Sequence, residues 1–106
     1  MTLNEIKALL VSVDSGIRHY FTMSDAEAYT YWEEGQLISR TGDDRHPVAD
    51  QAWRFYVHRF TRTEGDSTIA ALFEALDQDP RTTVKWITDF DKESGYIHHI
   101  LECEAY

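Results

Sequence analysis

The spacing of hydrophobic residues changes between residues 53 and 76. It is every second residue at first and every third or fourth residue afterwards. Residues 53–60, WRFYVHRF, predict a β-strand because they are rich in aromatic and β-branched side chains. Side chains alternate between the two faces of a strand, so both faces here are bulky. One face carries Trp53, Phe55 and Val57, and the other carries Tyr56, His58 and Phe60.

The pattern after this strand predicts an amphipathic helix. Its apolar residues recur at the i, i+3, i+4 and i+7 spacing of one helical stripe: Ile69, Leu72, Phe73 and Leu76. Asp66 or Ser67 is suited to cap its first turn by accepting hydrogen bonds from free backbone N–H groups. Asp79 and Pro80 end it, because proline disfavours helix in the residue before it.

Similar patterns predict the remaining elements. Residues 3–14 form a helix in which Thr2 and Glu5 have the spacing of a capping box. Residues 19–21 form a short strand, and residues 28–34 form a longer one that continues over 36–40 past a bulge or hairpin at Gly35. Residues 84–90 and 96–105 alternate as the two strands of a hairpin, whereas 41–50 is a polar loop without periodicity.

This order of elements, α-β-β-β-α-β-β, predicts an α+β fold. We expect a mainly antiparallel sheet of four to five strands with two helices packed on one face. The length of 106 residues predicts a single domain over residues 1–106. In this arrangement Trp53, Phe55 and Val57 form the core under the 69–76 helix, although nothing local excludes the reverse assignment of the two faces.

Composition and charge narrow the classes of function. The formal net charge is −9, which argues against phosphate-based or sequence-specific nucleic-acid binding and against docking on anionic lipid. No apolar run approaches the ~20 residues of a membrane span, and the start of the chain lacks the pattern of a signal peptide. The single cysteine provides no internal disulfide and is typical of a reducing, intracellular site of synthesis.

Residues that carry chemistry are present, but their spacing does not predict an active site. His98 and His99 point to opposite faces of a strand, and His99 lies too far from Cys103 to share a metal ion. Acidic neighbours raise the pKa of the Cys103 thiol, so a core role fits this residue better than nucleophilic catalysis. We therefore expect no enzyme activity, no catalytic residues, no metal and no cofactor.

Aromatic residues are more abundant than a small one-sided sheet requires. The chain has three Trp, six Tyr and five Phe, and most fall on the predicted strands. Tyr and Trp suit surfaces that a partner covers, because one end is apolar and the other forms hydrogen bonds. An aromatic core with Tyr hydroxyls at its rim explains them equally well. The candidate assembly surface joins the aromatic strands and the long loop: Tyr29, Tyr31, Trp32, Asp43, Asp44, Arg45, His46, Tyr56, His58 and Phe60.

From about Ile17 to Tyr106 the order of motifs resembles a known family. The motifs are His19-Tyr20, Tyr29–Glu33, Asp43-Asp44, Ala49-Asp50, Val57–Thr63, Asp66, Leu72–Leu76 and Gly95–His99. In this order the chain resembles the small minor capsid or tail-terminator proteins of long-tailed phages and of prophages in Gram-positive bacteria.

The resemblance implies a structural role in the virion, assembled in the bacterial cytoplasm. Proteins of this kind cap the finished tail tube and join it to the head as rings, commonly hexamers, without a cofactor. The implied partners are other copies of the chain, the tail tube and the head–tail connector proteins. An acidic ring would also let DNA slide through without sticking. Two alternatives stay open: a different small intracellular interaction or adaptor domain, and a small α+β enzyme or ligand-binding protein.

Overall fold

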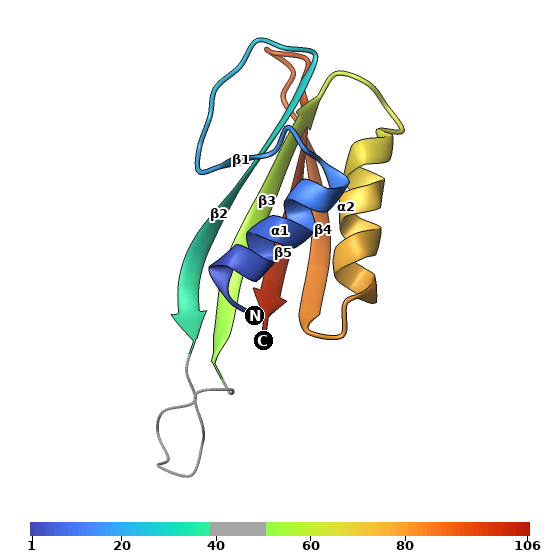
Figure 1. Ribbon diagram of the computed structural model, residues 1–106. Coiled ribbons are helices and arrows are strands. Elements are labelled where there is room, and N and C mark those ends of the chain that lie inside the picture. Colours follow the sequence, from blue (N-terminus) through green and yellow to red (C-terminus); the bar gives the residue numbers. More distant parts are fainter. Residues whose placement is uncertain (39–50) are drawn as a thin grey trace.

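The computed structural model describes residues 1–38 and 51–106 and contains two helices and five strands there (Figure 1). Their bounds are α1 Leu3–Val13, β1 Arg18–His19, β2 Ala28–Ile38, β3 Ala52–Thr61, α2 Ser67–Gln78, β4 Thr82–Phe90 and β5 Ile97–Ala105. The predicted α+β class and the predicted order of elements are confirmed. The predicted loop 41–50 and the end of the predicted 36–40 segment lie outside the described residues.

The five strands form one sheet in the order β1-β2-β3-β5-β4. Strands β2, β3, β5 and β4 pair antiparallel, as predicted. The short strand β1, however, runs parallel to β2, so the sheet is mixed. A parallel neighbour needs a crossover connection, and the chain between β1 and β2 supplies it.

Strand β1 ends one residue into the predicted 19–21 strand because the backbone turns at Tyr20. Tyr20 has φ 76°, a left-handed conformation that is uncommon for a residue other than glycine. Three contacts hold it there. Its N–H donates to the carbonyl oxygen of Trp32 at 2.6 Å, its hydroxyl donates to Glu34, and its ring stacks on His19. This turn sends the chain away from the sheet edge.

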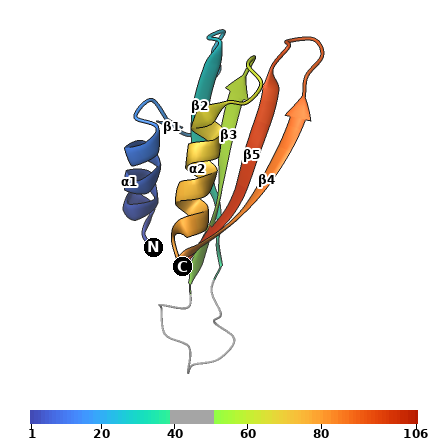
Figure 2. The same cartoon turned by 90° about the vertical axis from the view of Figure 1, so that its right-hand side faces the viewer.

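Both helices lie on one face of the sheet, as predicted (Figure 2). Helix α1 begins with the Thr2–Glu5 capping box, in which each side chain accepts a hydrogen bond from the other residue's N–H. Asp66 caps α2, accepting from the N–H of Thr68, and its carboxylate also binds the Arg59 guanidinium at 2.7 Å. This ion pair ties the start of α2 to the C-terminal end of β3.

The core lies between the helices and the sheet. It takes Ile6 and Leu10 from α1, and Ile69, Leu72 and Leu76 from α2. The sheet contributes buried side chains from one face of three strands: Trp32, Phe55, Val57, Leu101, Cys103 and Ala105. The prediction that the Phe55 and Val57 face lies under α2 is therefore confirmed. At Gly35 the pairing of β2 with β3 shifts by one residue, which confirms the bulge alternative there.

The helices are short. Helix α1 has 11 residues and α2 has 12. Neither of these helices, which are those of the described part of the chain, has the length and apolarity needed to cross a membrane.

Candidate assembly surface

The sheet has a second face, turned away from α1 and α2, which we call the open sheet face. Strand register places five of the predicted assembly residues on it: Tyr29, Tyr31, Tyr56, His58 and Phe60. Strand β5 adds His98, Ile100, Glu102 and Glu104, and β4 adds Lys85, Ile87 and Asp89. Figure 2 shows that both helices lie on the other side of the sheet. The sequence therefore predicted much of the composition of this face.

Aromatic and imidazole rings cover the half of the open sheet face nearest the β4–β5 turn. Phe60 is at its centre, stacked against Tyr29 with ring centroids 4.9 Å apart and against His98 at 4.1 Å. Tyr31 stacks on His58 at 4.6 Å. The Tyr96 ring meets both Tyr29 and Phe60 in T-shaped contacts. These rings span three adjacent strands and form a continuous, half-buried layer, called the ring layer, that neither α1 nor α2 covers.

A hydrogen-bonded chain runs through this layer. His58 Nε2 lies 3.2 Å from Glu33 Oε1, and His58 Nδ1 lies 3.0 Å from His98 Nε2. A carboxylate only accepts, so His58 Nε2 carries a proton; in neutral His58 its Nδ1 then accepts from His98. Burial lowers the pKa of both histidines, and the proximity of His58 lowers that of His98 further. Both rings are thereby favoured in the neutral form.

The connection from β1 to β2 covers part of the ring layer. Phe21 and Tyr31 form a T-shaped ring contact at 5.5 Å, and Tyr31 is 6% exposed. The Tyr96 hydroxyl donates to the carbonyl oxygen of Ala26 and secures this segment. Phe21 itself remains 66% exposed. The apolar surface at this end of the molecule thus extends from the sheet onto the connection.

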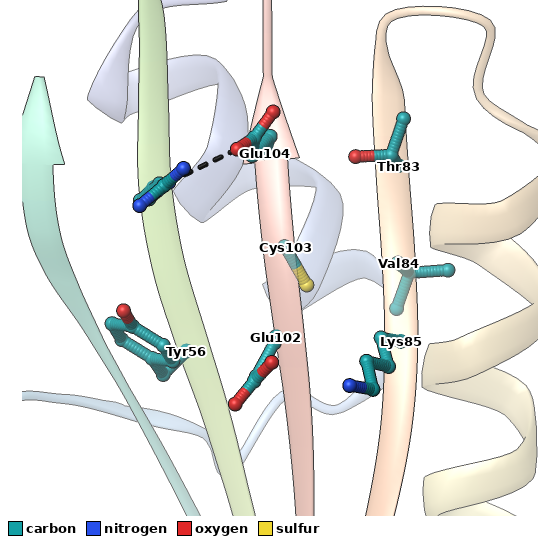
Figure 3. Close-up of a pocket in the computed structure, with 8 residues that line it drawn as sticks. Tyr56, Thr83, Val84, Lys85, Glu102, Cys103 and Glu104 are labelled. Carbon is teal, nitrogen blue, oxygen red and sulfur yellow. Dashed lines mark hydrogen bonds and ion pairs between the residues drawn. The ribbon is translucent and has the colours of Figure 1, made fainter. Parts of the chain in front are cut away.

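The other half of the open sheet face is charged (Figure 3). Arg54 Nε donates to Glu104 Oε1 at 3.0 Å across β3 and β5. Tyr56, Glu102 and Lys85 lie opposite one another on β3, β5 and β4. These side chains line a hollow of about 510 Å³. Because both signs of charge alternate across the strands, this half suits a polar rim around the aromatic half.

The structure corrects one predicted surface residue. Trp32 belongs to the helix-covered face, is 1% exposed, and packs in the core beside Phe55. It has the opposite orientation to Tyr31 because neighbouring residues on a strand alternate. His19 stacks on the Trp32 ring at 3.9 Å and closes the core at the β1 edge. The four loop residues of the prediction lie outside the described residues: Asp43, Asp44, Arg45 and His46.

Two ring residues of this surface were missing from the predicted set, namely His98 and Tyr96. The final strand was predicted, and its alternation places both on the face opposite Leu101. What the sequence did not supply was the strand order, in which β5 inserts between β3 and β4. Only that order brings His98 beside Phe60, since β3 and β5 are not consecutive in the chain.

Two residues of ligand type, Cys103 and His99, lie on the helix-covered face of the sheet. In residues 1–38 and 51–106 no three His, Cys, Asp or Glu side chains are grouped to hold a metal ion. Cys103 is buried on the helix-covered face, and burial together with Glu102 raises its thiol pKa. Its predicted core role is confirmed. His99, also on that face, accepts from the Trp86 indole N–H at 3.0 Å.

No family of known proteins and no curated protein matches the sequence of this chain.

Proposed function

We propose that this protein is a structural assembly protein of the phage tail-terminator or minor capsid type, and acts through its open sheet face. The observation that carries the proposal is the ring layer on that face. Tyr29, His58, Phe60 and His98 form a half-buried apolar surface that neither α1 nor α2 covers. An antiparallel sheet that faces water usually carries polar residues there. Aromatic residues with hydrogen-bonding tips are instead enriched where a protein partner binds.

The layout of charge supports the same proposal. A binding surface commonly has an apolar centre and a polar rim. The ring layer corresponds to the centre, and the charged half with Arg54, Lys85 and Glu104 corresponds to the rim. In a ring of subunits around a DNA channel, the net charge of −9 would keep DNA from adhering to the channel wall.

Two hollows of the described structure lie outside the ring layer. Two hollows, of about 510 and 810 Å³, lie at the charged half of the open sheet face and between α1 and the β2 and β3 ends. Neither is lined by a histidine, whereas the hydrogen-bonded pair His58 and His98 lies in the ring layer.

The experiment mixes the purified protein with tail tubes of the phage or prophage that encodes it. Electron microscopy should show rings at the tube ends. Phe60→Ala and Tyr56→Ala should reduce the fraction of capped ends severalfold while circular dichroism stays native. The matched control is Val11→Ala, which removes a 38% exposed apolar side chain from α1. Uncapped tubes with the wild-type protein would refute the proposal, as would equal loss of capping in all three variants. A ring reconstruction with acidic groups only on the outer rim would refute the channel role of the charge.

A further inference from the structure

Strand β4 is an edge strand that carries the charged residues Lys85 and Asp89 but is neither short, bulged nor interrupted by proline. It is the outermost strand on one side of the sheet and pairs along nine consecutive residues with β5, without a bulge. Natural edge strands are often short, bulged or interrupted by proline, so that other chains do not add to them. Residues 82–90 contain no proline. Trp86 and Phe90 are 38% and 57% exposed.

Hydrogen bonds at both ends of β4 identify the backbone groups that face outward. The carbonyl oxygen of Arg81 accepts from Tyr106, and the N–H of Asp91 donates to Tyr96. Odd-numbered residues of this strand therefore point their backbone groups toward β5. Because these groups alternate along an antiparallel strand, Val84, Trp86 and Thr88 direct their N–H and C=O groups away from the sheet. Figure 2 shows β4 as the outermost strand, bending away from α2 toward its turn.

We propose that β4 pairs antiparallel with β4 of a second copy of this chain, with Ile87 opposite Ile87 of that copy. The charges of the strand determine this register. Lys85 and Asp89 lie two residues on either side of Ile87, on the open sheet face. In this register each Lys85 lies opposite the Asp89 of the other copy, so two ion pairs form. These are non-hydrogen-bonded positions, where opposing side chains approach most closely.

The registers centred on Lys85 and on Trp86 lack this complementarity. A register centred on Lys85 places the two ammonium groups opposite each other, and like charges at this position are destabilising. A register centred on Trp86 places Lys85 opposite Ile87 and leaves the charges without direct partners. The Ile87 register also brings Val84 opposite the exposed Phe90 of the second copy, on the helix-covered side. The Ile87 register therefore buries apolar surface and also forms ion pairs.

The pairing joins the two sheets into one. Its two-fold axis is perpendicular to the sheet, so both open sheet faces lie on the same side of the dimer. Such a contact closes on itself and produces a dimer. It uses the β4 edge alone and leaves the ring layer accessible. The inference does not rest on the proposed role in tail assembly, and either can fail without the other.

Charge exchange tests the pairing. We expect sedimentation equilibrium of the wild-type protein to show a dimer. Lys85→Asp or Asp89→Lys alone should raise the dissociation constant of the dimer roughly tenfold, because each variant places two pairs of like charges opposite each other. The double variant K85D/D89K should return it to near the wild-type value. Lys92→Asp in the exposed β4–β5 turn makes the same charge change outside the strand and should leave the constant unchanged. A monomer at all concentrations, or a dimer indifferent to all these changes, would overturn the proposal.

Disulfide trapping tests the register. Ile87→Cys should yield a covalent dimer under mild oxidation, since the two thiols meet at the axis, whereas Thr83→Cys should not. Cys103 is 4% exposed and does not compete for the oxidant. A covalent dimer from Trp86→Cys, with none from Ile87→Cys, would overturn the register. The K85D/D89K comparison remains interpretable even where one single variant folds poorly, because recovery in the double variant reports on pairing.

Discussion

His58 Nδ1 and His98 Nε2 lie 3.0 Å apart and share a hydrogen bond between β3 and β5. The two histidines are 40 residues apart in the chain. The bond exists only when one imidazole accepts, so protonation of both rings removes it. Both rings lie in the aromatic half of the open sheet face, where burial favours the neutral form. The contact therefore makes the ring layer sensitive to acid.

We predict that the protein loses stability as the pH falls below about 6.5, the ordinary histidine pKa. The folded-state pKa of His58 and His98 is lowered by burial, and the carboxylates of Glu33 and Asp89 only partly offset this. The unfolded chain consequently takes up protons first, and stability present at neutral pH is lost on acidification. The measurement is the Tm by circular dichroism at about pH 7.5 and about pH 5.5, either side of that pKa.

The double variant H58Q/H98Q should reduce this pH dependence. Glutamine keeps a hydrogen-bonding side chain but does not titrate. Part of the dependence should remain, because burial also lowers the pKa of His99 on the other face of the sheet. An unchanged difference in Tm between the two pH values would contradict the assignment of the effect to this pair.

Gly35 provides a second prediction, because the Tyr56 ring lies over it. A Cβ atom at position 35 would lie 2.8 Å from Tyr56 Cε2, which is too close for an undisturbed contact. We expect Gly35→Ala to lower the free energy of unfolding by about 1–3 kcal/mol, the usual cost of overpacking. Urea denaturation measures it. In the Tyr56→Ala background, Gly35→Ala should lose most of its destabilising effect. If the effects of the two substitutions on the free energy of unfolding were simply additive, a clash between residue 35 and the Tyr56 ring would be excluded.

Gly16→Ala is the matched control for this experiment. Its added Cβ would meet Asp14 Oδ1 at 3.5 Å, an ordinary contact distance. This substitution should change the stability less than Gly35→Ala does.

The helices and the core were largely predictable because their signals are local. The spacing of Ile69, Leu72 and Leu76 gave the buried stripe of α2, and the Thr2–Glu5 motif gave the start of α1. The alternation in 53–60 also gave the correct two faces of β3. Each signal depends on residues within a few positions of one another, where backbone geometry decides which side chains share a face.

The site was predicted less completely because it depends on strand order. His98 meets Phe60 only because β5 inserts beside β3, and no local pattern encodes this insertion. Trp32 was placed on the surface because it lies among aromatic residues of a strand, although alternation gives it the opposite face from Tyr31. The parallel pairing of β1 involves only Arg18 and His19, too few residues to produce a sequence pattern.

The ion pair between Arg59 and Asp66 provides a third prediction. Both side chains are largely buried, with 13% and 8% exposed, and Asp66 also caps α2. Arg59→Met leaves the carboxylate buried without its cation, and we expect a loss of about 3–5 kcal/mol in urea denaturation. R59M/D66S should recover part of it, because serine still caps the helix.

The Arg54–Glu104 pair is the exposed control for the buried one. Its side chains are 48% and 30% exposed. Arg54→Met should therefore cost less than about 1 kcal/mol. If Arg59→Met and Arg54→Met destabilised the protein equally, the buried Arg59–Asp66 pair would contribute no more to stability than the exposed one.

The Cys103 thiol provides the last prediction, as a probe of global unfolding. Cys103 packs in the core opposite Phe55, and burial raises its pKa, so neither access nor thiolate formation favours reaction. A thiol reagent such as DTNB should therefore modify the native protein slowly and the urea-unfolded protein at once. Phe55→Ala should speed native labelling, because the cavity it leaves destabilises the fold by about 3–5 kcal/mol. Val11→Ala, at an exposed site on α1, should not. Fast labelling of the native wild-type protein would contradict the position of Cys103 between the sheet and α2.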